Sequence, residues 1–350
     1  MNKFLYLLVI MMCLVIASCD DEHSVNIDDG GETETPFWEN SHRVFAGLDG
    51  SVKRVTETTY TLAGEVEVEP VTLLDMSFNE AGRMTYYNAT GMEAQTRSVW
   101  QTMAYYSYQY DDNGRMTKAA VTSVGDEPVT YNLTYGEHTN YVPLIFPLGP
   151  MEFFLVKGLK TITSEDGTIS YEYDGEKAAY TQAGWMGDTE TQYVFAAGNP
   201  YPVKKVVTTS RDGEVLSEET TTYTYDAGGR LLKEDAKAME NTGDGLLETE
   251  RTVTKYADGK FLLPVSTLKD MAGGFTFDWS YTYDSNSHLQ QIDYFENKGT
   301  ADEVVAKEVY EYLSKDNNGN WTDSKQLQSG LINWRHVDGL VGVSRQISYW

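Results

Sequence analysis

Tryptophan rings are the side chains of this sequence best suited to hold a ligand by stacking. An indole ring has a flat apolar face and one N–H donor, so it can lie against a sugar ring. Five tryptophans are candidates for such stacking: Trp100, Trp185, Trp279, Trp321 and Trp334. Trp185 is flanked by glycines in Ala183–Gly187, a pattern typical of a loop tip, and it is the candidate ligand-binding residue. The alternative for each ring is packing in the core beside the tyrosines.

Carboxylates are the second group that could do chemistry, as the acid and base of a glycosidase. Asp and Glu number 53, so pairs arise by chance and the sequence nominates none. The sequence has no Gly-x-Ser-x-Gly nucleophile motif and no phosphate-cradling Gly-x-x-x-x-Gly-Lys motif. We therefore predict no catalytic residue and no enzymatic activity. The alternative is an enzyme that degrades envelope polysaccharide.

Metal ligands are sparse in the sequence. Four of the five histidines are scattered through the predicted folded domain, none with a second histidine at ligand spacing: His42, His138, His288 and His336. Asp111–Gly114 and Asp316–Asn320 are rich in oxygen atoms but lack the alternating ligands and distal Glu of an EF-hand. Their Asp, Asn and Gly residues are typical of turns. We predict no metal site and no cofactor.

The N-terminus carries a targeting pattern. Lys3 precedes an apolar run over Phe4–Ile16, and small residues lead into Cys19. The run is too short to span a bilayer and is typical of a signal peptide. The pattern resembles a bacterial lipobox, which implies a signal peptide over residues 1–18 and lipid attachment at Cys19. An ordinary secretory peptide with a chance cysteine is the alternative.

Acidic residues follow the cysteine directly at Asp20, Asp21 and Glu22. They resemble the export signal of surface lipoproteins of Bacteroidetes, with an acidic linker as the alternative. Residues 19–36 are polar and are predicted to form a flexible tether, and residues 37–350 to form the folded domain. We expect an outer-membrane lipoprotein, held to the membrane by its lipid and exposed at the cell surface.

Composition limits the classes of partner. The 350 residues carry a formal net charge of −26, which disfavours nucleic acid and anionic membrane surfaces. The hydrophobic fraction of 41% and charged fraction of 23% indicate a globular chain.

A repeated motif runs along most of the chain. Its clearest copies are Tyr108–Met116, Tyr223–Leu231 and Tyr281–Leu289. Each copy begins with an aromatic residue, one variable residue and the pair Tyr-Asp. A turn follows, and then a basic residue and an apolar residue. Degenerate copies lie at Met76–Met84, Tyr171–Lys177, Tyr193–Gly198, Lys255–Phe261 and Tyr310–Trp321. The aromatic anchors of the C-terminal half recur about every thirty residues.

The chemistry of the motif predicts β-hairpins. Tyr-x-Tyr places two rings on one face of a strand, because strand side chains alternate. Asp-x-x-Gly closes a turn, and the basic and apolar residues open the return strand. Further turns at Asp166-Gly167 and Asp212-Gly213 give about two strands per period.

The motif resembles the YD repeat of the Rhs family over roughly residues 70–350. Similar repeats occur in short lipoproteins of Bacteroidetes, and Gly319–Thr322 with Ile347–Tyr349 resembles the last unit of such proteins. Large Rhs proteins enclose a C-terminal toxin, whereas this sequence ends within its own repeat. The resemblance therefore implies an antiparallel β-meander without toxin activity, and it suggests carbohydrate binding.

The predicted fold is all-β: a long antiparallel meander of hairpins curled around an aromatic face, because a flat sheet would leave that face in water. A β-propeller is the alternative, although its four-stranded blade needs a longer period. The predicted function is a non-catalytic binding or structural module for a glycan or another envelope protein.

Overall fold

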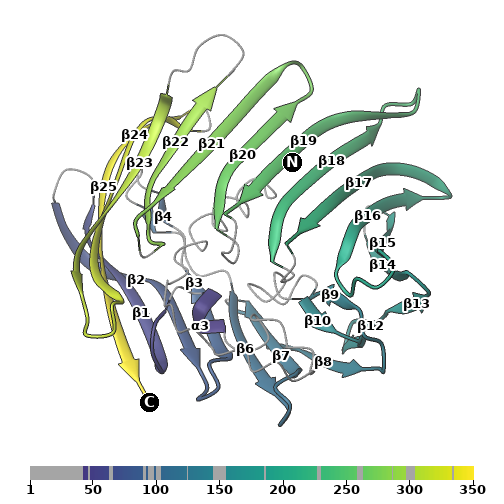
Figure 1. Cartoon of the computed structure of the whole chain (residues 1–350), viewed down its shortest axis with the longest axis horizontal. Helices are drawn as coiled ribbons and strands as arrows, with labels where there is room; N and C mark the ends of the chain where they lie inside the picture. The colour runs from purple at the N-terminus through teal and green to yellow at the C-terminus, as the bar shows by residue number, and fades with distance from the viewer. Residues whose placement is uncertain are drawn as a thin grey trace.

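The computed structural model describes residues 42–45, 48–62, 66–89, 92–93, 98–99, 104–123, 125–144, 155–184, 187–226, 230–257, 263–285, 287–296, 304–332 and 335–350. Within these ranges a short helix, α3 (His42–Phe45), is followed by strands (Figure 1). The strands are β1 (Val52–Leu62), β2 (Val66–Phe78), β3 (Met84–Ala89), β4 (Met92–Glu93), β5 (Ser98–Val99), β6 (Ala104–Tyr110), β7 (Met116–Ser123), β8 (Val129–Tyr135), β9 (Tyr141–Pro143), β10 (Leu155–Lys157), β11 (Leu159–Ser164), β12 (Gly167–Ser170), β13 (Glu172–Asp174), β14 (Lys177–Gly184), β15 (Gly187–Phe195), β16 (Pro202–Arg211), β17 (Glu214–Tyr225), β18 (Leu231–Asn241), β19 (Leu246–Tyr256), β20 (Pro264–Met271), β21 (Phe275–Tyr283), β22 (Leu289–Glu296), β23 (Val304–Lys315), β24 (Trp321–Ile332) and β25 (Arg335–Tyr349).

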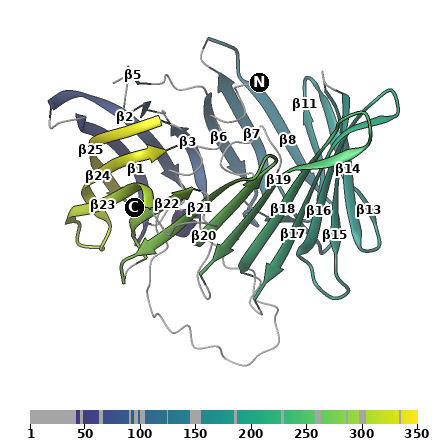
Figure 2. The ribbon, with the colours of Figure 1, turned by 90° about the horizontal axis from the view of Figure 1, so that it is seen from above.

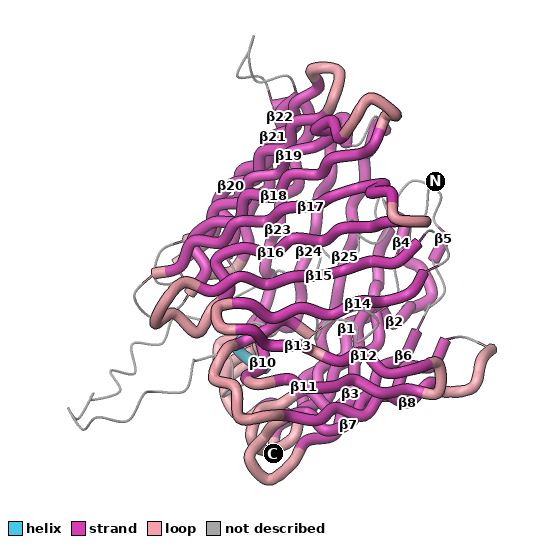
Figure 3. Tube along the Cα trace, turned by 90° about the vertical axis from the view of Figure 1, so that its right-hand side faces the viewer, coloured by secondary structure: helices cyan, strands magenta, loops and turns pink. Residues whose placement is uncertain are grey.

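A 21-stranded antiparallel sheet contains all of these strands except β4, β5, β9 and β10, which form two small pairs. From β13 to β25 every strand pairs with its successor (Figure 3). From β1 to β12 the order is β1-β2-β3-β6-β7-β8-β11-β12. The predicted antiparallel meander is confirmed.

The sheet curls into a nearly closed, barrel-like shape (Figures 1 and 2). β25 pairs with β24 on one side and with β1 on the other, so the two ends of the chain's sheet meet. On the far side, β12 pairs with β11 and β13 pairs with β14, and only Tyr171 separates β12 from β13. One continuous ladder does not support the β-propeller alternative, which requires separate four-stranded blades.

Asp-initiated turns join alternate strands, as the motif predicts. At Asp111 the backbone N–H donates to the carbonyl of Arg115 at 2.9 Å, and the Arg115 N–H donates to Asp111 Oδ1 at 2.8 Å. The same pair of bonds recurs at turns that begin with Asn79, Asp226, Asp284 and Asp316. A carboxylate or amide oxygen thus closes each turn internally, which sets the register of the hairpin.

The basic residue of the motif also has a local role. Arg230 Nε donates to Asp226 Oδ2 at 2.7 Å, and His288 Nδ1 lies 3.1 Å from Asp284 Oδ2. Before His288, Ser287 adopts a φ of 63°, the left-handed conformation that glycine supplies in the copies with Gly114 and Gly319. The side chain at the end of the turn therefore uses the second carboxylate oxygen, while the backbone uses the first.

The second tyrosine of the motif ties successive hairpins together. Its hydroxyl donates to the carbonyl of the residue that opens an earlier strand, at 2.5–2.9 Å. The pairs are Tyr110 with Met84, Tyr135 with Met116, Tyr173 with Leu159, Tyr283 with Pro264, and Tyr312 with Leu289. Four of these bonds join neighbouring strands of the ladder, and the Tyr173 bond joins β13 to β11. All five satisfy hydroxyls that burial would otherwise penalise.

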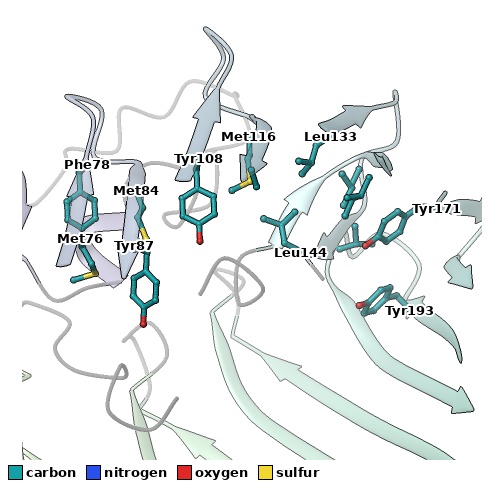
Figure 4. Packing of buried hydrophobic residues seen from close by; sticks show 14 of the residues in the cluster. Met76, Phe78, Met84, Tyr87, Tyr108, Met116, Leu133, Leu144, Tyr171 and Tyr193 are labelled. Atoms are coloured by element: carbon teal, nitrogen blue, oxygen red, sulfur yellow. The ribbon is translucent and has the colours of Figure 1, made fainter. Parts of the chain in front are cut away.

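The largest buried cluster lies within residues 48–195 and takes members from β1 to β3, β6 to β9, β11, β14 and β15. Figure 4 shows Met76, Phe78, Met84, Tyr108 and Met116 extending from neighbouring strands on the same side of the sheet. Each of these side chains is at most 3% exposed. Burial of such side chains contributes roughly 1.5–3 kcal/mol each, so this cluster is the main hydrophobic core among the described residues.

The opposite face of the sheet carries ion pairs. Asp235 Oδ2 lies 2.9 Å from Arg251 NH2 and 3.0 Å from Lys233 Nζ. The hydrogen bond from Arg251, together with the positive charges, lowers the pKa of Asp235 to about 2. Asp235 neighbours the core-facing Glu234 and Ala236 in sequence, and therefore projects to the other face. This outward face is charged and contacts water.

The seam between β1 and β25 holds an ion pair. Arg345 Nε and NH2 both donate to Glu57 Oε1, at 3.0 and 2.6 Å, and these two residues are register partners. The guanidinium lies 3.6 Å from the ring centroid of Trp321, and its side chain is 4% exposed. Charge pairing and cation–π contact therefore hold the first and last strands together in a desolvated place.

Removing the carboxylate at the seam should destabilise the whole sheet. Glu57→Gln leaves the Arg345 guanidinium buried without a counter-charge, which we expect to lower the free energy of unfolding by about 3 kcal/mol. The double variant Glu57→Gln/Arg345→Met removes both charges and should recover part of that loss. Equilibrium denaturation with urea measures all three proteins.

Asp75→Asn is the matched control for the seam. Asp75 pairs with Arg54 at 2.7 Å on the outward face, where the Arg54 side chain is 57% exposed. We expect this control to cost less than about 1 kcal/mol. A loss in Glu57→Gln no greater than in Asp75→Asn would show that the seam pair does not hold the sheet closed.

Candidate functional site

The core-facing side of the sheet changes character from β16 onward. Register partners place Tyr193 of β15 opposite Lys205 of β16, and Lys205 opposite Thr221 of β17. Tyr193 belongs to the main buried cluster. Lys205 and Thr221 therefore lie on the core-facing side of the sheet, because register partners share a face. Of the described residues between Pro202 and Tyr256, Pro202 and Thr221 alone are buried. The residues of β16 to β19 are thus mostly partly buried rather than fully buried, and buried clusters return around Trp279 and Trp321.

A buried glutamate lies on this face in β23. Glu308 is 8% exposed and accepts hydrogen bonds from Tyr294 Oη at 2.6 Å, Tyr310 Oη at 2.8 Å and Gln326 Nε2 at 2.8 Å. Gln326 Nε2 also donates to Tyr310 Oη at 3.1 Å. A buried carboxylate is costly unless it is hydrogen-bonded, and these donors from three adjacent strands stabilise it.

A second glutamate with a similar setting lies in β18. Tyr256 Oη donates to Glu234 Oε2 at 2.6 Å, and Tyr223 is the register partner of Glu234 in β17. Burial raises the pKa of Glu234, and the Tyr256 hydrogen bond and the charge of Lys205 oppose that rise. Burial also raises the pKa of both tyrosines, so their hydroxyls remain neutral donors.

Runs of aromatic rings accompany both glutamates. One run, with ring centroids 5.2, 5.4 and 6.3 Å apart, joins Tyr141, Tyr201, Tyr225 and Tyr223. The other, with centroids 6.3 and 6.4 Å apart, joins Phe277, Trp279 and Tyr294. Rings beside fixed acceptors and hydroxyls suit a ligand with both apolar faces and hydroxyl groups. We call Glu234, Glu308 and the partly exposed rings of these runs the tyrosine–glutamate face; the rings are Tyr201, Tyr223, Tyr225, Phe277 and Tyr294.

The tryptophans named from the sequence divide into two groups. Trp279 is 9% exposed and Trp321 is 4% exposed. Each packs in a buried cluster that includes tyrosine, which is the core-packing alternative stated for these rings. Trp185, Trp100 and Trp334 lie outside the described residues, as does the lipid-attachment candidate Cys19. Next to Trp185 in sequence, the structure describes Gly184 at the end of β14 and Gly187 at the start of β15, and these two residues are register partners.

The histidines have structural surroundings where the structure describes them. His42 is buried, and its Nδ1 accepts a hydrogen bond from the Met84 N–H at 2.9 Å. His288 is buried within its Asp284 turn, and burial lowers its pKa against the opposing effect of that aspartate. His138 is exposed and stacks on Tyr173 with ring centroids 4.0 Å apart.

Sequence reasoning missed Glu234 and Glu308. Both are hidden among 53 acidic residues, most of which lie on the outside of such a sheet. A signal exists for Glu308, because Glu308, Tyr310 and Tyr312 alternate along one strand and therefore share the core-facing side. Glu234 has no comparable signal, since Tyr256 reaches it from the neighbouring strand.

Two searches of the described ranges were negative. No helix there is long and apolar enough to cross a membrane. In the same part of the chain, no group of three or more His, Cys, Asp or Glu side chains is arranged to hold a metal ion.

Comparisons with known proteins give remote similarities. No protein-family model matches the chain, and no curated protein matches it. Among solved structures, it is similar to a porin-like protein from Bacteroides uniformis, at 14% identity over 85% of this chain and 96% of that chain, with a TM-score of 0.34. A porin-like protein from Bacteroides vulgatus matches at 14% identity over 62% and 99%, with a TM-score of 0.26.

A toxin complex is also similar in part. A chain of the TcdB2–TccC3–Cdc42 structure matches at 10% identity over 73% of this chain and 14% of that chain, with a TM-score of 0.15. Each TM-score is below 0.5, so these likenesses carry no argument about function, which rests on the residues of this chain.

The buried histidine of α3 predicts acid sensitivity. Burial, and secondarily the charge of Arg83, lowers the pKa of His42 from 6.5 to about 3. The unfolded chain therefore binds this proton more readily than the folded chain. The stability that neutral His42 contributes is complete above about pH 6.5 and is lost as the pH falls towards 3, by at most about 1.4 kcal/mol per pH unit.

His42→Asn removes this titration but keeps an acceptor near the Met84 N–H. The free energy of unfolding of this variant should fall less steeply than that of the wild type between about pH 7 and about pH 4. Exposed His138→Asn is the control and should keep the wild-type slope. Equal slopes in His42→Asn and the wild type would show that His42 is not held neutral.

Proposed function

We propose that this protein is a cell-surface lipoprotein that binds glycans without modifying them, through the tyrosine–glutamate face. The observation that carries the proposal is the pair of carboxylates, Glu234 and Glu308, each oriented by tyrosine hydroxyls beside runs of aromatic rings. Sugars present apolar ring faces and hydroxyl donors, which match aromatic rings and fixed carboxylate acceptors respectively. The net charge of −26 favours neutral glycans over anionic ones.

A binding role is favoured over catalysis by the state of the carboxylates. Glu308 already accepts three hydrogen bonds from fixed side chains, which limits its use as a nucleophile or general base. In this proposal Glu308 holds the tyrosines and the glutamine in place, and its remaining acceptor capacity is left for a sugar hydroxyl. The serial arrangement of strands repeats such contacts along the sheet.

In this proposal, a repeated sequence unit builds the tyrosine–glutamate face. The recurring Asp turns and tyrosine–carbonyl bonds support a YD-like repeat of about thirty residues whose tyrosines line one side of the curled sheet. Rigid repetition would hold several sugar units of one chain at once, and multivalent contact strengthens weak single-site binding.

Binding and cleavage can be measured together on the full chain. We expect tryptophan fluorescence to change saturably with a neutral polysaccharide in a panel of neutral and charged ones, without release of reducing sugar. Glu308→Gln with Tyr294→Phe should weaken binding about tenfold, because two polar contacts are altered at the face. Release of sugar would instead support the polysaccharide-degrading alternative.

Asp293→Asn is the matched control for binding. Asp293 precedes Tyr294 in β22 but pairs with Lys307 on the outward face at 3.4 Å. Its binding should equal that of the wild type. Equal weakening by both variants, or no binding to any polysaccharide, would contradict a glycan role for this face and leave an envelope protein as the partner.

The anchor is tested separately through Cys19. In a Gram-negative host the wild-type chain should incorporate a labelled fatty acid, fractionate with the outer membrane and be cleaved by protease added to intact cells. Cys19→Ser should lose the label and the membrane fraction, because a chain without acyl groups has no hydrocarbon to insert. Cys13→Ser should behave as the wild type. Labelling of Cys19→Ser would contradict lipid attachment at that residue.

A further inference from the structure

Exposed apolar side chains gather at the strand ends opposite the Asp turns. Leu246 and Leu247 open β19, and Met271 and Phe275 border the next turn, between β20 and β21. Their exposures are 36%, 58%, 41% and 46% respectively. We call these four residues the apolar rim. Large apolar side chains scattered singly on a surface are ordinary, but four at adjacent turns form a patch.

The rim spans the tips of two hairpins that are neighbours in the sheet. β19 pairs with β20, and Met271 is the register partner of both Glu250 and Phe275. The Ala272 N–H donates to the Thr249 carbonyl at 2.8 Å, which ties the second turn to the first hairpin. Figure 1 shows the two hairpins one after the other in the sheet, with their turns at the same end. The patch therefore sits on strand ends that backbone bonds hold in place.

Exposed carboxylates surround this end of the sheet. The described turns at this end carry acidic residues that face solvent: Asp126, Glu127, Glu165, Asp166, Asp212, Glu214 and Asp244. Arg211 is the exposed basic residue beside them. The acidic residues nearest to the apolar rim are Asp244, in the turn before Leu246, and Asp212 and Glu214, at the turn between β16 and β17. Acidic charge thus lies beside the apolar rim.

This combination selects one class of occupant. A phosphate-rich surface, whether nucleic acid or anionic lipid, would be repelled by the acidic turns. A second copy of the same rim would bring like charges together. A cationic protein segment with apolar side chains would satisfy both the rim and the surrounding carboxylates. We propose that the apolar rim docks a basic, amphipathic segment of another protein, an interaction independent of the tyrosine–glutamate face.

A defined peptide tests the proposal on the full chain carrying Cys19→Ser, so that no detergent is needed. The probe is a fluorescent amphipathic peptide of leucine and lysine, compared with one in which glutamate replaces lysine. We expect saturable binding of the lysine peptide alone. The double variant Leu247→Ser/Phe275→Ser should weaken that binding about tenfold, since interface energy is concentrated in a few apolar anchors.

Two sets of variants keep the result specific. Leu313→Ser/Leu327→Ser removes equally exposed leucines, 52% and 40%, from strands away from the rim, and should bind as the wild type does. Asp212→Asn/Asp244→Asn should reduce the salt dependence of binding, because two of the surrounding charges are lost. Thermal unfolding followed by circular dichroism checks that every variant is folded.

Several outcomes would overturn the proposal. They are equal binding of both peptides, unchanged binding by the rim variant, and equal weakening by the Leu313/Leu327 control. Rim-dependent binding to vesicles of anionic phospholipid would assign the patch to a membrane instead. Rim-dependent dimers in sedimentation would assign it to a second copy of the chain. Loss of glycan binding in the rim variant would show that the two surfaces are not independent.

Discussion

The pairing of β1 with β25 is the interaction on which the rest of this structure depends. The two halves of the meander, β1 to β12 and β13 to β25, would each expose an edge strand here, and the pairing satisfies both of these edges at once. Closure also gives the sheet an inside, where side chains from strands far apart in sequence meet. At the seam, the Glu57–Arg345 pair and the Trp321 ring supply charge and dispersion contacts in a desolvated place. A backbone ladder alone would leave the register of this junction weakly specified.

Within the closed sheet, the motif residues have local and non-local roles. The aspartate and the residue four positions later close a turn without help from the rest of the molecule, as at Asp226 and Arg230. The second tyrosine acts over a longer range, as Tyr312 does when it donates to the Leu289 carbonyl. Each hairpin is therefore self-contained at its turn and bonded to an earlier strand through a tyrosine. This division explains how a repeated sequence builds one sheet rather than separate hairpins.

The inside of the sheet is not uniform, and that difference separates stability from function. The strands up to β15 fill it with buried apolar side chains such as Phe78 and Met84. From β16 to β19 the same face carries lysine, threonine, glutamate and half-buried tyrosine. Buried clusters around Trp279 and Trp321 follow, and the Glu308 carboxylate lies in this later part because tyrosine hydroxyls compensate its desolvation. One part of the chain thus holds the molecule together, and another part carries the polar and aromatic groups to which we assign the proposed glycan binding.

Local patterns by themselves determined the strands, the turns and the all-β class of this protein. Tyr-x-Tyr alternation and the Asp-x-x-Gly turn are short-range rules that act within a few residues, so Tyr108–Met116 predicts its hairpin directly. Only the tertiary structure decided which hairpin meets which, the closure of β25 on β1 and the clustering of Glu308 with Tyr294 and Gln326. Those contacts join residues on different strands, and their positions depend on the curvature and register of the whole sheet. A single sequence contains no local signal for either quantity, because many registers bury the same alternating pattern equally well.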